Sequence, residues 1–122
     1  MTPVRPNPTS SSARAAEVAV ARLGEMSPDL RGCAVIDSEG HALAASGDPE
    51  RWAAPANALL AAADAAGGER ATHVHVATED GEAFGVRHED LAMVAVAERF
   101  VLSSLMIFDM RAVLRDLAKE IG

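Results

Sequence analysis

Apolar and polar residues form their most informative pattern between Thr72 and Ala97, where three short β-type runs are separated by two tight turns. The last of these runs, Leu91 to Ala97, is apolar at every position. A strand that is apolar on both faces needs cover on both faces. We therefore expect this strand at the centre of a sheet, with helices above and below it.

The first helix is predicted from Ala13 to Met26, because apolar residues recur there at helical spacing. Ser12 precedes the helix and is the expected N-cap. Residues 1–11 carry three prolines and a run of serines, with almost nothing to bury. They are expected to form a disordered N-terminal tail, which leaves residues 12–122 as the folded domain.

An alanine-rich middle helix is predicted from Ala53 to Ala66. Gly67 and Gly68 are expected to end it, since glycine readily adopts the left-handed conformation found after a helix. Pro55 is expected in the first turn, because a deeper proline would remove a hydrogen bond and clash with the preceding turn. The residues expected to face the sheet are Leu59, Leu60 and Ala63.

Four further strands are predicted, and glycine-containing turns join them in pairs. The first turn contains Gly40 at a position that needs a positive φ, and the second contains Asp80 and Gly81. The expected strands are Gly32–Asp37, His41–Ser46, Ala71–Thr78 and Glu82–Arg87.

The last helix is predicted from Val101 to Ile121, with one apolar face and three basic residues elsewhere on it. The residues expected on the apolar face are Leu102, Met106, Met110, Val113, Leu117 and Ile121. The complete order is then helix, two strands, helix, three strands and helix.

Composition and charge exclude several classes of partner. A chain of 122 residues is expected to form one domain. The net charge of −7 and the scattered arginines argue against binding to nucleic acid. The single cysteine, Cys33, cannot form an intrachain disulfide, and we expect it to be buried in a protein of a reducing compartment. No apolar run is long enough to cross a membrane and no secretory signal is visible, so the predicted location is cytoplasmic without membrane binding.

Residues capable of catalysis or metal binding form no convincing constellation. His73 and His75 share one face of a predicted strand and could be half of a zinc site, but cysteine partners and a paired carboxylate motif are missing. The acidic residues near the turns are interpreted as solvated, and no phosphate-binding loop is present. We therefore expect a protein that is not an enzyme and that uses no metal or cofactor.

Several segments of this chain resemble the Roadblock family of dynein light chains and bacterial regulators of Ras-like GTPases. These segments are GCAVIDSEGHALAAS, the alanine-rich helix, TEDGEAFGVRHEDLAMVAVA and FDMRAVLRDL. The resemblance covers residues 13–121, and profilin-like domains share parts of the pattern. It implies an α+β domain with a five-stranded antiparallel sheet in the order 2-1-5-4-3. The middle helix would cover one face and the terminal helices the other.

That strand order places Ala71–Thr78 at an edge of the sheet, without a proline or lysine to protect it. We expect this strand to pair with its own copy across a two-fold axis, as in the dimers of the family. The alanines of the middle helix would let a second helix approach closely. The residues predicted at this dimer interface are Thr72, His73, Val74, His75, Val76, Ala58, Ala61, Ala62 and Ala65.

Two functions are compatible with the sequence. The favoured one is a non-enzymatic homodimer that binds and regulates a small Ras-like GTPase or a related signalling partner, with Arg51 and Trp52 as candidate partner-binding residues. The alternative is a small-molecule sensor domain of the profilin-like or PAS-like type. A sensor would enclose a ligand cavity between its sheet and helices, whereas an interaction module would have a sealed core.

Overall fold

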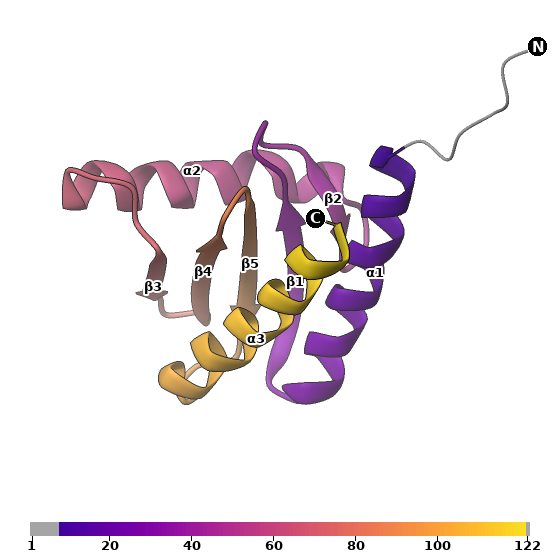
Figure 1. The fold of residues 1–122 in the computed structure, drawn as a ribbon. Coiled ribbons are helices and arrows are strands. Elements are labelled where there is room, and N and C mark those ends of the chain that lie inside the picture. The colour runs from indigo at the N-terminus through magenta and orange to yellow at the C-terminus, as the bar shows by residue number, and fades with distance from the viewer. Residues whose placement is uncertain (1–7, 122) are drawn as a thin grey trace, which may run out of the picture.

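The computed structural model describes residues 8–121 and has the predicted order of elements (Figure 1). The helices are α1 (Pro8–Met26), α2 (Glu50–Gly67) and α3 (Ser103–Ile121). The strands are β1 (Leu30–Ile36), β2 (Ala42–Ala45), β3 (His73–Ala77), β4 (Glu82–His88) and β5 (Leu91–Ala97). The fold is therefore α+β.

The five strands form one antiparallel sheet in the order β2-β1-β5-β4-β3. The fully apolar run Leu91–Ala97 is the central strand, paired with β1 on one side and β4 on the other. Val94, for example, pairs with Ala34 of β1 and with Gly85 of β4. Both the predicted strand order and the central position of β5 are confirmed.

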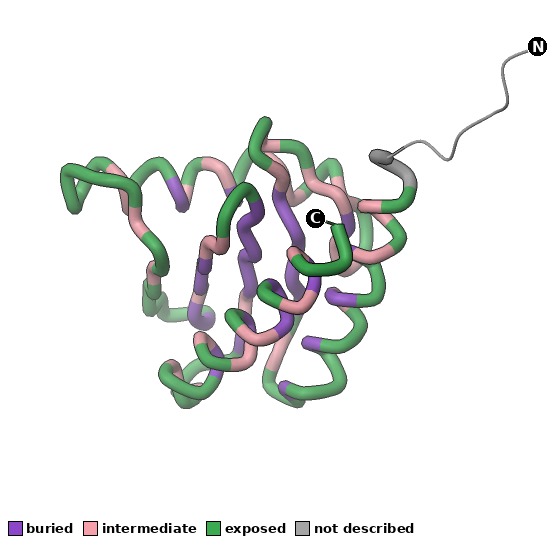
Figure 2. Tube along the Cα trace, in the orientation of Figure 1, coloured by how far each residue is buried: buried purple, intermediate pink, exposed green. Residues whose placement is uncertain are grey.

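The helices form two layers, with α2 on one face of the sheet and α1 and α3 on the other (Figure 1). Successive residues of β5 point to opposite faces, so Met93 and Ala95 pack towards α1 and α3 while Ala92 and Val94 pack towards α2. The core under α1 and α3 is the larger one, and buried positions are sparse along α2 (Figure 2). This imbalance leaves much of α2 open to solvent.

Helix α1 begins at Pro8, five residues earlier than predicted. Proline is well suited to the first turn of a helix, where its missing N–H has no intrahelical partner to lose. Ser12 lies inside the helix and is not its N-cap. The predicted tail is therefore helical from Pro8 onward, and residues 1–7 of that tail lie outside the described part of the chain.

Helix α2 begins at Glu50, so Pro55 lies in its second turn and not in the first. A proline at this position cannot donate to the carbonyl of Arg51. Both residues are exposed, and solvent can therefore satisfy that carbonyl. The end of the helix agrees with the prediction, because Gly68 has a φ of 77° and its N–H donates to the Asp64 carbonyl.

Helix α3 begins at Ser103 and buries a narrower face than predicted. Leu102 precedes the helix and is 65% exposed, and Ile121 at the other end is also exposed. The buried residues of the helix are Met106, Met110, Val113, Leu114 and Leu117. The apolar side chains at the start of α3 are therefore not explained by the core.

Cys33 is buried in β1, as predicted. Desolvation raises the pKa of its thiol to about 11, and its Sγ lies 3.8 Å from the Val20 carbonyl oxygen of α1. A thiol in this setting stays protonated near neutral pH, so Cys33 acts as a small core residue.

Candidate dimer and partner-binding surface

Strand β3 leaves one complete edge of the sheet unpaired. Its only strand neighbour among residues 8–121 is β4. The Arg87 N–H donates to the Thr72 carbonyl and the Thr78 N–H to the Gly81 carbonyl, which fixes the alternation of the ladder. By that alternation the backbone groups of His73, His75 and Ala77 point away from β4. They form a row of donors and acceptors that can pair with another strand.

His75 is held firmly on the α3 side of β3. Its ring stacks on Phe84 with the planes parallel and the centroids 4.5 Å apart. Its Nε2 lies 2.6 Å from Glu82 Oε1, and the second oxygen of Glu82 accepts a hydrogen bond of 2.9 Å from the Val101 N–H. Glu82 is buried, so it is not the solvated turn residue that the sequence suggested. Instead it ties β3 to the segment that leads into α3.

The four histidines do not assemble into a metal site. His73 lies on the same side of β3 as His75, and the Arg111 guanidinium is 3.1 Å from its Nδ1. His41 contacts Asp37 and Glu39 in the β1–β2 turn, while His88 lies at the far end of the β4 ladder, beside Glu89. Within residues 8–121, no group of three histidine, cysteine or acidic side chains is placed to hold a metal ion.

The α2 side of β3 carries Val74 and Val76. Val74 packs over Gly85, where an added Cβ would lie 2.9 Å from Val74 Cγ1 and 3.3 Å from Leu60 Cδ2. Val76 is 40% exposed. Helix α2 thus covers Val74 but leaves Val76 at the open edge.

Helix α2 adds a low-bulk surface next to this edge. It crosses the sheet, and its C-terminal end projects past β3 (Figure 1). Ala58, Ala61, Ala62 and Ala65 lie on it, and all four are exposed. The two groups of residues predicted for the dimer interface, the alanines of α2 and the residues of β3, are thus both largely exposed.

An ion pair fixes the corner between α2 and β3. Asp64 accepts hydrogen bonds from both Arg87 NH groups, at 2.6 and 3.0 Å, and from the Ala71 N–H at 2.8 Å. The guanidinium of Arg87 is the main cause that lowers the pKa of Asp64 to about 2. Sequence patterns gave no sign of this pair, because its partners are 23 residues apart.

Substitution of Asp64 by Asn is expected to lower the free energy of unfolding near neutral pH. This loss of stability should become smaller as the pH falls. A carboxyl group with a folded-state pKa of about 2 and an unfolded-state pKa of about 4 stabilises the fold above pH 4. That contribution disappears as the pH falls from about 4 to about 2. Urea unfolding at a series of pH values would measure it. Arg87→Gln should show the same pH dependence, and a deficit that persists undiminished at pH 2 would contradict this account.

Arg51 and Trp52 lie near the other end of α2. The Trp52 indole N–H donates to the Ser46 carbonyl at 2.9 Å, and its ring lies where a Cβ on Gly32 would be only 2.9 Å away. Trp52 is half-buried and packs on the core, whereas Arg51 is exposed to solvent. At 1.5 Å per residue these two positions are about 20 Å from Ala65, so they are separate from the β3 edge.

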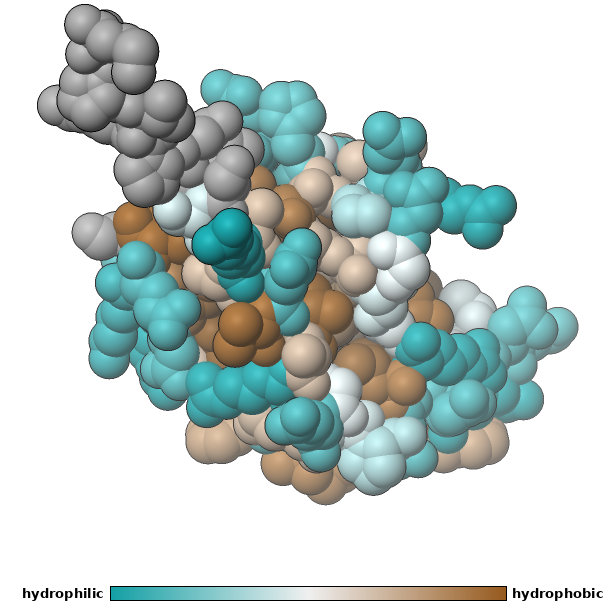
Figure 3. Space-filling model, turned by 90° about the vertical axis from the view of Figure 1, so that its right-hand side faces the viewer, coloured by the Kyte–Doolittle hydropathy of each residue, from teal (hydrophilic) through white to brown (hydrophobic). Residues whose placement is uncertain are grey.

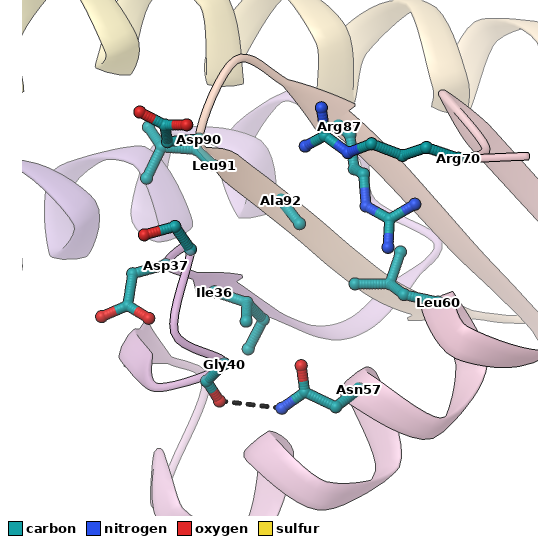
Figure 4. Close-up of a pocket in the computed structure, with 11 residues that line it drawn as sticks. Ile36, Asp37, Gly40, Asn57, Leu60, Arg70, Arg87, Asp90, Leu91 and Ala92 are labelled. Atoms are coloured by element: carbon teal, nitrogen blue, oxygen red, sulfur yellow. Dashed lines mark hydrogen bonds between the residues drawn. The ribbon is translucent and has the colours of Figure 1, made fainter. Parts of the chain in front are cut away.

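A pocket of about 230 Å³ opens at the sheet end beneath α2 (Figure 4). Its floor contains Ile36, Leu60 and Ala92, and Asn57 and Arg87 line its walls. The Asn57 amide donates to the Gly40 and Ala53 carbonyls, and Arg87 is paired as described above. Asn57 thus joins α2 to the β1–β2 turn and Arg87 joins α2 to β4, so both side chains already have partners within the chain.

No protein-family model and no curated protein matches this sequence, whereas solved structures do. A Roadblock/LC7 domain from Streptomyces avermitilis has a TM-score of 0.74 at 17% identity, over 84% of this chain and 94% of that one. The gliding protein MglB from Thermus thermophilus has a TM-score of 0.70 at 16% identity, over 97% and 93%. Profilin II from Acanthamoeba castellanii has a TM-score of 0.57 at 17% identity, over 84% and 95%.

These similarities define an α+β fold of the Roadblock and profilin type. Within it, the chain has the Roadblock/LC7 fold, which the sequence resemblance predicted. Identities of this size establish the fold and no more. None of the helices between residues 8 and 121 combines the length and the apolar character needed to cross a membrane.

Proposed function

We propose that this protein is a non-enzymatic homodimer that binds and regulates a small Ras-like GTPase or a related signalling partner. The observation that carries the proposal is the unpaired β3 edge beside the alanine surface of α2. In the proposed dimer, β3 pairs with its copy and the two α2 helices lie together above the joint sheet. A two-fold axis satisfies both surfaces at once, because each contacts its own equivalent.

Several features favour this arrangement over an unpaired edge. The backbone groups of His73, His75 and Ala77 have no partner strand among residues 8–121, and a second β3 would supply one in the correct spacing. The contacts of His75 with Phe84 and Glu82 hold the strand in an extended form before association. A preorganised edge loses less conformational entropy on pairing, which favours binding.

The proposed GTPase surface is the solvent-facing side of the paired α2 helices, with Arg51 at its periphery. A regulator of this kind acts by binding one nucleotide state of the GTPase more tightly than the other, which shifts the equilibrium between them. A rigid platform suits this role because it does not adapt equally to both states. The ion pair between Asp64 and Arg87 contributes to that rigidity at the α2–β3 corner.

Binding to purified small Ras-like GTPases from the same genome, loaded with GDP or a GTP analogue, tests the proposal. At least one GTPase is expected to bind with affinities that differ about tenfold or more between its two nucleotide states. Arg51→Glu should weaken this binding about tenfold, since it reverses a charge at the periphery of the proposed interface. Calorimetry or fluorescence anisotropy would provide the affinities.

Arg14→Glu is the matched control, because Arg14 is exposed on α1 at the opposite face of the sheet. It carries the same change of charge and should leave the affinity within about twofold. Equal weakening by both variants would indicate a general electrostatic effect and would remove Arg51 from the interface. Absence of binding to every GTPase of the genome would overturn the GTPase part of the proposal.

A further inference from the structure

A second surface remains exposed at the start of α3, on the face of the sheet opposite α2. Four large apolar residues lie within nine positions of each other there, and all are more than half exposed. They are Phe100 (85%), Leu102 (65%), Leu105 (53%) and Phe108 (67%), which we call the apolar patch. Figure 3 shows another side of the molecule, with the end that carries α1 and β2 towards the viewer, where apolar and polar groups lie side by side. Clustered exposed apolar residues mark interaction sites, whereas single ones do not.

The first turns of α3 carry large apolar side chains on more than one side of the helix. Met106 and Met110 pack into the core, whereas Leu105 and Phe108 are exposed to solvent. In a helix on the surface of a globular protein, the side away from the core is usually polar. Only the inner side of this one is covered, by the sheet and by α1. The outer side therefore lacks a partner.

The backbone before α3 adds a second sign of function. Phe100 has a φ of 64°, a conformation that is uncommon for a bulky residue. Its ring is in solvent, covered only by the Arg99 guanidinium at 4.7 Å from the centroid. The left-handed backbone at Phe100 and the exposure of its ring to solvent both cost free energy. Neither of them adds to the packing of the fold. Such features concentrate at binding sites.

Basic residues continue the outer side of α3 beyond Phe108. Arg111, Arg115 and Lys119 follow at spacings of four residues, which places them on one side of the helix, and all three are exposed. Among residues 8–121, Arg115 and Lys119 form no ion pair. Asp116, which lies between them in sequence, turns aside to pair with Arg22 of α1 at 2.6 Å. A chain with a net charge of −7 thus presents a cationic row on this helix.

We propose that the outer side of α3 docks an acidic amphipathic helix of a partner protein. The apolar side chains of that helix pack on Leu105 and Phe108, and its carboxylates pair with Arg111, Arg115 and Lys119. The charge row selects this partner, since it would repel a basic helix and gain nothing from a neutral one. This surface adjoins the proposed dimer edge only at Arg111, which contacts His73 of β3, and it lies on the opposite face of the sheet from α2.

Designed peptides of about five helical turns test the proposal with the full-length protein. Each peptide carries leucines at helical spacing in one half and a row of glutamates in the other half. Two versions, one with the leucine half first and one with the glutamate half first, allow the peptide to pack parallel or antiparallel to α3. Twin peptides have lysine in place of glutamate. One acidic peptide is expected to bind at least about tenfold more tightly than its lysine twin, as measured by fluorescence anisotropy.

Variants of the chain make the test specific. Phe108→Ser should weaken binding of the acidic peptide about tenfold, and Arg115→Glu should reduce or reverse the preference for the acidic peptide. Val18→Ser is the matched control, because Val18 is an exposed apolar residue of α1 outside the apolar patch, and it should leave binding unchanged. Thermal unfolding monitors the fold, and Phe108→Ser should unfold normally because this side chain is exposed.

Three outcomes would overturn the proposal. Equal binding of the acidic and lysine peptides, or no binding below about 1 mM, would remove the predicted partner chemistry. Unchanged binding by Phe108→Ser would remove the predicted surface. Self-association that Phe108→Ser abolishes would show that a second copy covers this side instead. Peptide binding should persist in a variant whose β3 edge can no longer pair with a second strand. Failure of the proposed dimer and failure of this surface can therefore be told apart.

Discussion

A His75→Pro variant is expected to be monomeric at concentrations where the unmodified chain and a His75→Val variant are dimeric. The His75 N–H points away from β4, so proline removes a donor from the open edge without removing a hydrogen bond of the sheet. Each strand of a two-fold pair would lose one donor and leave one carbonyl of its partner unsatisfied. We expect the dimer dissociation constant to rise about a hundredfold or more, or about 3 kcal/mol. Sedimentation velocity would measure the change.

The comparison with His75→Val isolates the backbone effect. Both substitutions remove the stacking on Phe84 and the contact with Glu82, but valine keeps the N–H and favours extended structure. Circular dichroism would show that both variants remain folded. Dimerisation by the proline variant, or a monomer in the unmodified chain, would show that β3 does not pair with its copy.

Substitution of Gly81 by alanine is expected to give a large loss of stability, about 2–4 kcal/mol in the free energy of unfolding. An added Cβ would lie 2.6 Å from the carbonyl oxygen of Ala97, a backbone atom of the central strand, and 2.8 Å from an Arg31 nitrogen. Neither the β3–β4 turn nor β5 can move without disturbing the ladder between them. Urea unfolding followed by circular dichroism would measure the effect.

Gly67→Ala provides the matched control. Gly67 is the last residue of α2, and a Cβ added there would have no atom within 4 Å. Alanine is favoured over glycine in helices, so this variant is expected to be unchanged or to gain up to about 1 kcal/mol. If both variants lost similar stability, the close approach at Gly81 would not be the cause.

The turn that contains Gly81 illustrates how sequence and structure contribute different information. The Asp80-Gly81 pair correctly indicated a turn between two strands. Gly40 does have the positive φ expected of a hairpin glycine, at 87°, whereas Gly81 does not have a positive φ. Glycine is needed at position 81 because a distant strand passes close to it. Sequence patterns predict local conformation well, but they do not reveal that a segment distant in sequence passes close by.

The candidate interface was partly visible in the sequence. The alanines of α2 and the unprotected β3 were both identified, because low bulk and missing charges can be read residue by residue. The tie through Glu82 and the pair between Asp64 and Arg87 were missed. Each joins residues whose contact depends on the arrangement of elements, and an acidic residue near a turn looks the same whether it is buried or solvated.

Periodicity and apolar runs in the sequence determined the elements, their order and the central place of Leu91–Ala97, because these depend on local spacing and on total burial. The tertiary structure alone decided which side of each helix stays uncovered. Leu105 and Phe108 lie outside the apolar face that the sequence predicted for this helix, and the structure shows that neither the sheet nor α1 covers them. Whether a side chain is exposed depends on how far the neighbouring elements extend over it. The residue pattern of one helix carries no information about that.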